Sequence, residues 1–509
     1  MISRRRFFGQ AFSAAAFASV AGCVPDGIGS RPGASAADAG AGAVAAPQKP
    51  LLKVGLLADV HILVAKDRKM QSREVFEKAL RYFDEMKADA VLLAGDIADC
   101  GLIAELECAA EIWRKVFPEG KRSDGEPIEQ LFALGDHDLG GFAQKYPWAA
   151  KHSADPDAVN HPICDADVPA VWKGIFGEDW SPVQIKTVKG YNFVLAHFPI
   201  KGGGGTGDVP NPGLAEALAK ADADPAKPFF YTQHRPVYGT LPEMNPADLE
   251  KSVNHKALAA HPNVLAFFGH CHRNCSDELN LWQGAYTAVH LPSTNYCGTR
   301  WGRENSFSVG NQPSKPRPQQ MQRVDVDRSR QLMFMDVYAD RIVLARRDIA
   351  NDAPMGPDWI VPLPSPDGSC SSAARAEKAL APQFRPKAWV KAKSGRGKNR
   401  AQKVVDQVVV YFPVAPSRNG MPRAFDYEVT ATAEGFGPLV RRVFPTRAYW
   451  AEDFDKEYVR CKFGRDELPE GKPVSFTVRP ANCYRQHGEA IGPAVFDGVW
   501  SDDAAEVDV

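Results

Sequence analysis

The feature that most constrains the fold is a series of short apolar runs, each of which ends in acids or histidines. The runs are KVGLLADVH, AVLLAGDIAD, LFALGDHD, NFVLAHF, PFFYTQHRP and NVLAFFGHCH. Segments with apolar residues at helical spacing separate the early runs; SREVFEKALRYFDEMKA, for example, lies between KVGLLADVH and AVLLAGDIAD. Continuous apolar runs interleaved with helices indicate strands buried on both faces of an α/β layered sheet, flanked by helices. Functional side chains then belong at the carboxyl ends of those strands.

Polar clusters stand where these runs end. A single Gly-Asp after a strand is an ordinary turn more often than a ligand, so each cluster alone is a weak signal. Asp-x-His and His-x-His, however, place both side chains on one side of the chain within chelating reach. Together they predict a pocket rich in nitrogen and oxygen that holds divalent metals. The clusters are Asp59-Val60-His61, Gly95-Asp96, Gly135-Asp136-His137-Asp138, His197, His234 and Gly269-His270-Cys271-His272.

In order along the chain, ADVH, GDIAD, GDHD, QHRP and GHCH resemble the motifs of calcineurin-like metallophosphoesterases, over roughly residues 51–348. The resemblance implies an enzyme, a metal-dependent phosphoesterase with two divalent metal ions (Mn, Fe or Zn). It implies that the first metal is bound by Asp59, His61, Asp96 and His272, and the second by the bridging Asp96 with Asp136, His234 and His270.

The resemblance also implies a mechanism. A hydroxide that bridges the two metals attacks phosphorus, and the metals offset charge on the phosphoryl oxygens. His137 stabilises or protonates the leaving group, and Asp138 holds the imidazole of His137 and favours its charged form. Arg235, Tyr296 and Arg300 are candidate substrate contacts, because arginine forks suit phosphate and these residues are expected near the pocket.

Asp136, His197 and Asp99 bear on the choice of metal, of ligand and of subfamily. The family normally has Asn where this chain has Asp136, and the added negative charge predicts tighter metal binding, weaker activation of the hydroxide and a preference for Mn or Fe. His197 also lies two residues before a proline and competes with His234 for one ligand position, although its place in the chain favours His234. Asp99 stands where purple acid phosphatases carry a tyrosine ligand, which disfavours that subfamily.

The expected function is hydrolysis of phosphate monoesters or diesters, by a phosphatase or phosphodiesterase. A nucleotidase or nuclease is an alternative, but the net charge of −1 and the lack of interleaved basic and aromatic stretches disfavour polymeric nucleic acid as a partner. A third alternative is a non-catalytic surface-binding module with a vestigial metal site. The intact set of ligands disfavours that alternative.

The N-terminus predicts export. Residues 1–23 contain SRRRFF, as in twin-arginine signals, then a short apolar stretch that ends in the lipobox-like VAGC. Cys23 is the expected lipidation site, which predicts a membrane-anchored lipoprotein at the periplasmic or cell-surface side; a signal peptide cleaved near Ala21 is the alternative. Residues 24–50, rich in Ala, Gly and Pro, predict a flexible linker.

The rest of the chain predicts a metallophosphoesterase domain at 51–350, a linker at 351–403 and a smaller β-sandwich domain at 404–509. The linker contains the basic stretch KAWVKAKSGRGKNRAQK, which could bind phosphate or anionic lipid but is expected to be a solvated loop. Nine of the ten cysteines remain after Cys23, and Cys461 with Cys483 is one candidate disulfide among pairings that the sequence leaves open.

Overall fold

The computed structural model describes residues 49–64, 70–140, 162–199, 212–242, 246–300, 302–306, 329–398, 403–417, 422–445, 447 and 458–500. The expected export signal, the lipidation site Cys23 and nearly all of the expected N-terminal linker lie outside these residues, so they stay predictions. No helix within the described residues has both the length and the apolar character that a membrane span requires. Residues Lys49–Val509 form one compact unit by themselves.

The first sheet has seven strands, and the three that precede the expected ligands run parallel. β2 is buried at every residue, as its continuous apolar run predicts. In spatial order the strands are β12 (Ala353–Pro354), β11 (Arg341–Asp348), β10 (Gln331–Val337), β1 (Leu52–Leu57), β2 (Ala90–Ala94) and β3 (Glu129–Ala133), with β13 (Trp359–Pro362) also paired to β11.

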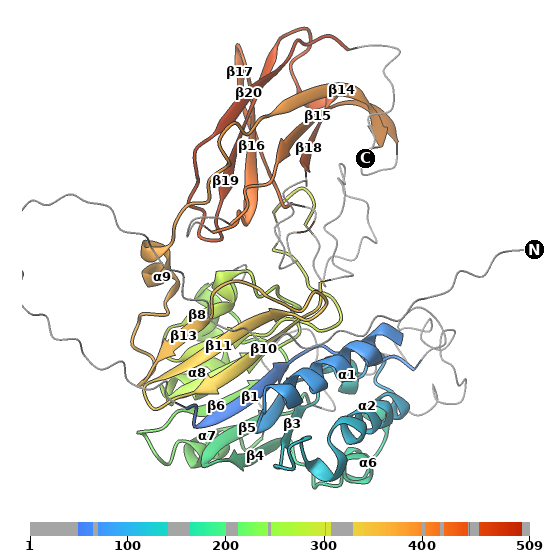
Figure 1. Ribbon diagram of the computed structural model, residues 1–509, viewed down its shortest axis with the longest axis vertical. Helices are drawn as coiled ribbons and strands as arrows, with labels where there is room; N and C mark the ends of the chain where they lie inside the picture. The colour runs from blue at the N-terminus through green and yellow to red at the C-terminus, as the bar shows by residue number, and fades with distance from the viewer. Residues whose placement is uncertain are drawn as a thin grey trace, which may run out of the picture. The chain divides into compact units, whose positions relative to one another are not determined.

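Helices cover one face of the first sheet (Figure 1). Leu57 and Leu93 of the sheet pack with aromatic side chains of the helices, among them Trp113. Gly55 of β1 allows α1 to approach closely, because a Cβ at this position would lie 2.5 Å from the ring of Phe83. The helices are α1 (Met70–Glu85), α2 (Ile103–Val116) and α6 (Val168–Phe176).

The second sheet has six strands, of which β5, β6, β7 and β9 run parallel. Its inner face packs against the first sheet through side chains such as Phe230 and Leu56, and its outer face carries two helices. In spatial order the strands are β4 (Val183–Val188), β5 (Tyr191–Ala196), β6 (Phe229–Gln233), β7 (Val264–Phe268), β9 (Thr287–His290) and β8 (Leu281–Gln283), and the helices are α7 (Leu214–Ala221) and α8 (Val253–Ala259).

Helices, two sheets and helices therefore form four layers, which confirms the predicted α/β layered fold. The layers bring the carboxyl ends of β1, β2 and β3 near those of β6 and β7. Short helical elements lie in the connections: α3 (Asp136–Leu139), η1 (Pro118–Gly120), η3 (Ile163–Asp165), η4 (Pro246–Lys251) and η5 (Glu278–Asn280).

The C-terminal strands form two antiparallel sheets around a separate core, which confirms the predicted β-sandwich. Val410 and Phe463 of one sheet meet Val429 and Phe476 of the other in that core. One sheet consists of β14 (Lys391–Lys398), β15 (Val404–Pro413) and β18 (Tyr458–Gly464); the other consists of β17 (Phe436–Val443), β16 (Asp426–Ala433), β19 (Val474–Ala481) and β20 (Ile491–Phe496), with the turn η7 (Arg465–Glu467) after β18.

The stretch 351–403, expected as a linker, contains regular structure. β13 pairs with β11, α9 (Ser372–Lys378) follows, and β14 pairs with β15. Within the basic stretch expected as a solvated loop, Lys391–Lys398 thus forms an edge strand of the sandwich, because its backbone pairs along the whole of β14. The exact division between the two domains stays a prediction.

The candidate disulfide between Cys461 and Cys483 is wrong. Both thiols are free and buried. Cys461 lies in the sandwich core beside residues such as Phe463, whereas Cys483 lies beyond the end of β19, where its carbonyl oxygen accepts a hydrogen bond of 3.1 Å from Arg300.

Candidate metal centre

The seven expected metal ligands follow the carboxyl ends of parallel strands. Five of them lie on loops whose backbone is left-handed, with φ of 55° at Asp59, 51° at His61, 53° at Asp96, 68° at His270 and 48° at His272. Positive φ is uncommon outside glycine, although Asp and His tolerate it better than most residues. Each such residue costs on the order of 1 kcal/mol or more, and residues of this kind cluster at functional sites.

Two glycines of the Gly-Asp motifs allow the ligands to crowd together. A Cβ at Gly135 would lie 2.2 Å from Oδ1 of Asp96, and a Cβ at Gly95 would lie 2.5 Å from Nδ1 of His234. Gly95 also has a φ of 85°, which other residues rarely adopt. Gly95 is therefore required both by the site and by its turn, and Gly135 by the site alone.

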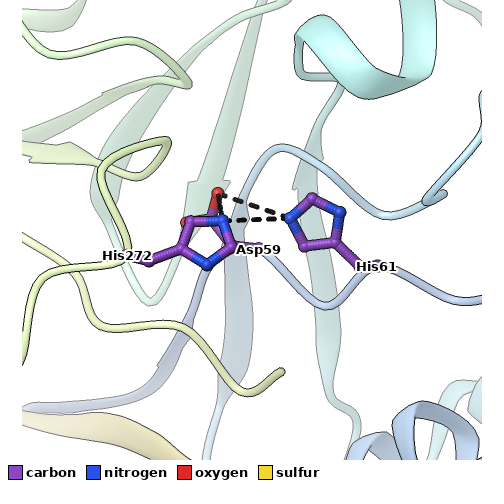
Figure 2. A group of neighbouring side chains, drawn as sticks. All are labelled: Asp59, His61 and His272. Carbon is purple, nitrogen blue, oxygen red and sulfur yellow. Dashed lines mark hydrogen bonds and ion pairs between the residues drawn. The ribbon is translucent and has the colours of Figure 1, made fainter. Parts of the chain in front are cut away.

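Asp59, His61 and His272 form the first group of ligand atoms (Figure 2). Nε2 of His61 lies 3.1 Å from Nε2 of His272, which lies 3.2 Å from Oδ1 of Asp59. Nδ1 of His272 donates to the carbonyl oxygen of Tyr296 at 2.9 Å, so its Nε2 carries a lone pair. Two ring nitrogens this close require a proton or a cation between them.

Asp136, His234 and His270 form the second group. Nδ1 of His234 donates to the carbonyl oxygen of Ala94 at 2.8 Å, so its Nε2 is the ring nitrogen left to face the ligand cluster. That nitrogen faces two carboxylate oxygens, at 3.0 Å from Asp96 and 2.9 Å from Asp136. Nδ1 of His270 lies 3.1 Å from Oδ1 of Asp136. Electron pairs that converge in this way fit a bound cation.

Asp96 lies between the two groups. Its Oδ2 is 3.0 Å from Nε2 of His234 and 3.7 Å from Nε2 of His61. Its Oδ1 accepts a hydrogen bond of 2.9 Å from the backbone of His137, which fixes the carboxylate. This position suits the expected bridging role. Within each of the groups that contain these residues, one ligand atom per residue lies within 4.8 Å of the others.

The charges of the site suit cations as well. Burial would raise the pKa of Asp59, Asp96 and Asp136, but the neighbouring histidines hold the pKa of each carboxyl below its usual range. For His234, burial lowers the pKa, yet Asp96 and Asp136 raise it well above its usual range. Three ionised carboxylates in a nearly dry pocket therefore attract positive charge strongly.

The sequence of residues 52–274 matches that of the calcineurin-like phosphoesterases. These residues form a calcineurin-like phosphoesterase domain. The two groups of ligand atoms are its candidate metal centre.

Solved structures to which the chain shows similarity include a dimetal phosphatase from Danio rerio, with 14% identity, a TM-score of 0.35, and coverage of 62% of this chain and 99% of that one. A purple acid phosphatase from yellow lupin has 12% identity, a TM-score of 0.35, and coverage of 62% and 54%. Vacuolar protein sorting 29 from Cryptosporidium parvum has 13% identity, a TM-score of 0.27, and coverage of 61% and 97%. No curated protein matches the chain.

His137 of the phosphoesterase domain lies beside the first group of ligands. Its ring is 4.5 Å from that of His61, edge to face, and its Nδ1 is 2.6 Å from the carbonyl oxygen of Asp99. Burial opposes protonation, but Asp96 and Asp136 raise the pKa of His137 above its usual range. The position and charge suit a proton donor, and the catalytic role of His137 stays a prediction.

Asp138 does not hold the imidazole of His137. Its carboxylate accepts hydrogen bonds from the backbone N–H groups of Gly135 at 2.6 Å, Ala98 at 2.7 Å and Ile97 at 3.3 Å. Consecutive side chains of the short helix α3 diverge by about 100°, so Asp138 points to the backbone while His137 points to the ligands. The orienting contact expected from Asp138 is made by the carbonyl group of Asp99.

The charge of Asp136 is balanced by Arg235. The guanidinium of Arg235 donates to Oδ2 of Asp136 at 2.8 Å and stacks on Phe198, with 5.1 Å from Cζ to the ring centre. The sequence predicted that Asp136 lowers the positive charge of the site, but that prediction did not include the charge of Arg235. With Arg235 in contact, the pair is neutral overall. A substrate contact at Arg235 stays a prediction.

The other two expected substrate contacts are Tyr296, which lies beside the ligands, and Arg300, which does not contact them. The ring of Tyr296 lies against the first group, 4.3 Å from the ring of His272, and burial raises its pKa. Arg300 instead is buried, forms an ion pair with Asp277 and donates to the carbonyl oxygen of Cys483 at 3.1 Å. Its donors are engaged in these structural contacts, so the expectation for Arg300 is wrong.

The competition between the two histidines favours His234. His197 lies after β5, where its Nδ1 accepts a hydrogen bond of 3.0 Å from the backbone of Leu134 and its Nε2 is 3.3 Å from Gln184. Burial lowers the pKa of His197 to about 3, so it stays neutral. It belongs to none of the four groups of candidate ligands found among the described residues.

Asp99 contacts a metal-binding histidine, a role that was not expected from the sequence. Its Oδ1 lies 3.1 Å from Nδ1 of His61, on the side of the ring away from the ligand cluster. Carboxylates in this position orient metal-binding histidines and raise their basicity. The motif GDIAD could have indicated this contact, because its second acid, Asp99, follows β2 as the ligand Asp96 does.

Proposed function

We propose that the chain is a two-metal hydrolase of phosphate monoesters or diesters. The observation that carries this proposal is the convergence of seven Asp and His side chains from five strands, with Nε2 of His234 and Nε2 of His272 directed inward. Two bound divalent cations would supply a water of lowered pKa as nucleophile and would offset charge on the phosphoryl oxygens.

The residues of the chain would supply the rest. Asp59, His61 and His272 would hold one cation, while Asp136, His234 and His270 would hold the other, with Asp96 between them. His137 would donate a proton to the leaving oxygen, because its raised pKa favours the charged form near neutral pH. The carbonyl group of Asp99 would keep its ring in place.

A panel of chromogenic monoesters and diesters, assayed with Mn²⁺, Fe²⁺ and Zn²⁺ separately, tests the proposal. We expect metal-dependent turnover that chelation abolishes and that Asp96→Asn, which removes the bridging charge, lowers by about 10²-fold or more. Asp222→Asn is the matched control, since Asp222 pairs with His261 at 2.8 Å outside the ligand groups. A folded protein that binds no metal and hydrolyses nothing would favour the non-catalytic alternative.

We also propose that the protein acts outside the cytoplasm on a lipid tether. The support is sequence alone: twin arginines, an apolar stretch and VAGC. Labelling with a radioactive fatty acid tests it, because Cys23→Ser should abolish label and membrane retention, while changing the twin arginines to lysines should block export. Labelled protein that persists in the Cys23→Ser variant would contradict the lipid anchor.

A further inference from the structure

The loop that follows β9 leads from the candidate metal centre to the β-sandwich. At its start, the carbonyl oxygen of Tyr296 accepts a hydrogen bond of 2.9 Å from Nδ1 of His272, and the backbone N–H of Gly298 donates to the carbonyl oxygen of His272 at 2.6 Å. Residues 296–300 and 302–305 form this bridging loop. The orientation of His272, a ligand of the first group, therefore depends on where the bridging loop holds its backbone.

The end of the bridging loop is bound to the sandwich by buried polar groups. Oδ1 of Asn305 accepts from the backbone N–H of Phe444, just after β17, and Nδ2 of Asn305 donates to the carbonyl oxygen of Phe444, both at 2.9 Å. Nε of Arg303 donates to Oδ2 of Asp426, at the start of β16, at 2.6 Å. Asn305, Arg303 and Asp426 are all buried, so the loss of one partner leaves another polar group unsatisfied.

Arg300 contacts both sides at once. Its guanidinium forms an ion pair with Asp277, which follows His272 in the loop after β7, and its Nη1 donates to the carbonyl oxygen of Cys483 in the sandwich at 3.1 Å. The guanidinium also lies against the ring of Phe425, with 4.9 Å from Cζ to the ring centre. The middle of the bridging loop is thereby fixed to the neighbourhood of the ligand and to the sandwich.

The second group of ligands is oriented from elsewhere. Nδ1 of His234 donates to the carbonyl oxygen of Ala94, and Asp136 is held by the guanidinium of Arg235. Neither Ala94 nor Arg235 belongs to the bridging loop or to the sandwich. A change at the sandwich end of the loop should therefore affect the first group and leave the second group as it is.

We propose that the β-sandwich positions the first group of metal ligands, with Asn305, Arg303 and Arg300 as the positioning residues through which it acts on His272. The bridging loop transmits the position, because it is bonded to His272 at one end and to the sandwich at the other. The sandwich then supports the metal centre as well as forming a domain of its own. This inference rests on the proposed two-metal function.

Calorimetric titration of the metal-free, full-length protein with Mn²⁺ tests the proposal. Asn305→Ala removes both bonds to Phe444 and should weaken one of two affinities about tenfold, while the other stays within about twofold. His272→Ala identifies the affinity that belongs to the first group, because it removes a ligand of that group. Asp426→Asn, which leaves Asn305 in place, should give a smaller loss in the same affinity. Unchanged affinities in Asn305→Ala would overturn the proposal.

Val410→Ala is the matched control, because Val410 lies in the sandwich core and its truncation leaves the polar contacts of the bridging loop in place. It should lower the free energy of unfolding in urea, as Asn305→Ala does, yet keep both affinities for Mn²⁺. An equal loss of affinity in the two variants would show a general effect of stability and would refute the positioning role.

Hydrogen exchange separates this proposal from the proposed function. A parent protein that binds no Mn²⁺ would contradict the two-metal hydrolase alone. In the metal-free protein, Asn305→Ala should still raise deuterium uptake at the amide of Gly298, which is bonded to His272, whereas Val410→Ala should not. Mass spectrometry of peptic fragments that cover residues 296–300 measures the uptake. Equal uptake in the parent and in Asn305→Ala would rule out the link through the bridging loop.

Discussion

Arg235 holds one carboxylate oxygen of Asp136 at 2.8 Å, while the other oxygen faces His234 at 2.9 Å and His270 at 3.1 Å. The carboxylate is thereby limited to presenting a single oxygen to the ligand cluster. Its charge is offset by a guanidinium whose side chain is only 16% exposed. Asp136 and Arg235 should therefore act as one unit in binding metal.

A double-mutant cycle tests this coupling. Arg235→Gln should tighten Mn²⁺ binding and slow turnover, because Asp136 is then uncompensated and free to turn both oxygens inward. Asp136→Asn should weaken binding, because an unpaired guanidinium repels the cation. The double variant should return close to the parent, with a coupling free energy of about 1–3 kcal/mol. Calorimetric titration of metal-free protein measures the affinities, and strictly additive effects would contradict the coupling.

Metal content should separate the two histidines that the sequence left in competition. His234→Ala should lose at least one of two bound metals, because its Nε2 faces both Asp96 and Asp136. His197→Gln should retain both, since His197 contacts Leu134 and Gln184 instead. Inductively coupled plasma mass spectrometry of folded, purified protein gives the stoichiometry. Loss of metal in the His197 variant alone would reverse the assignment.

Asp138→Asn should act mainly on stability. One amide oxygen cannot accept from Gly135, Ala98 and Ile97 as two carboxylate oxygens do, and the NH₂ group would face a backbone donor. We expect the free energy of unfolding in urea to fall by about 2 kcal/mol. His137→Ala is the comparison, with slower turnover and a smaller loss of stability. Unchanged stability for Asp138→Asn would contradict the structural role of these hydrogen bonds.

Glu105 should make stability fall as pH rises. Burial and the nearby charge of Asp99 raise the pKa of Glu105 from 4.5 to about 8. Between these values the folded protein binds more protons than the unfolded chain, so the free energy of unfolding decreases with pH. Glu105→Gln keeps an acceptor for the N–H groups of Cys100 and Leu102.

Urea unfolding of the metal-free protein measures the effect. Relative to the parent, Glu105→Gln should gain stability between pH 5 and pH 8, by about 1.4 kcal/mol for each unit of the raised pKa at most. Glu77→Gln is the control, because Glu77 pairs with Arg81 and Lys115 at the surface. Parallel pH profiles for the parent and Glu105→Gln would rule out a buried neutral carboxyl.

The sequence predicted the layers and the seven converging side chains, because both depend on order along the chain. Apolar runs identify parallel strands, and parallel strands bring residues such as Asp59 and His234 to the same edge. The contacts of Arg300 and Asp138 could not be predicted in this way. Arg300 pairs with Asp277 and Cys483, which no local pattern connects to it, and the direction of Asp138 depends on the loop after β2.

The basic strand β14 also could not be predicted from local sequence. Its composition is that of a solvated loop, and only pairing with β15 makes it a strand. Backbone hydrogen bonds to a distant segment override local propensity, and a single sequence does not reveal the partner.

The left-handed backbone at five of the ligands restricts which donors evolution or a designer can use there. Aspartate, asparagine and histidine tolerate this conformation, whereas β-branched residues do not. Cysteine is not among the residues enriched in this conformation, so exchanging these ligands for thiolates would add backbone strain in three loops. The backbone conformation at these positions thus favours oxygen and nitrogen ligands over thiolates in this pocket.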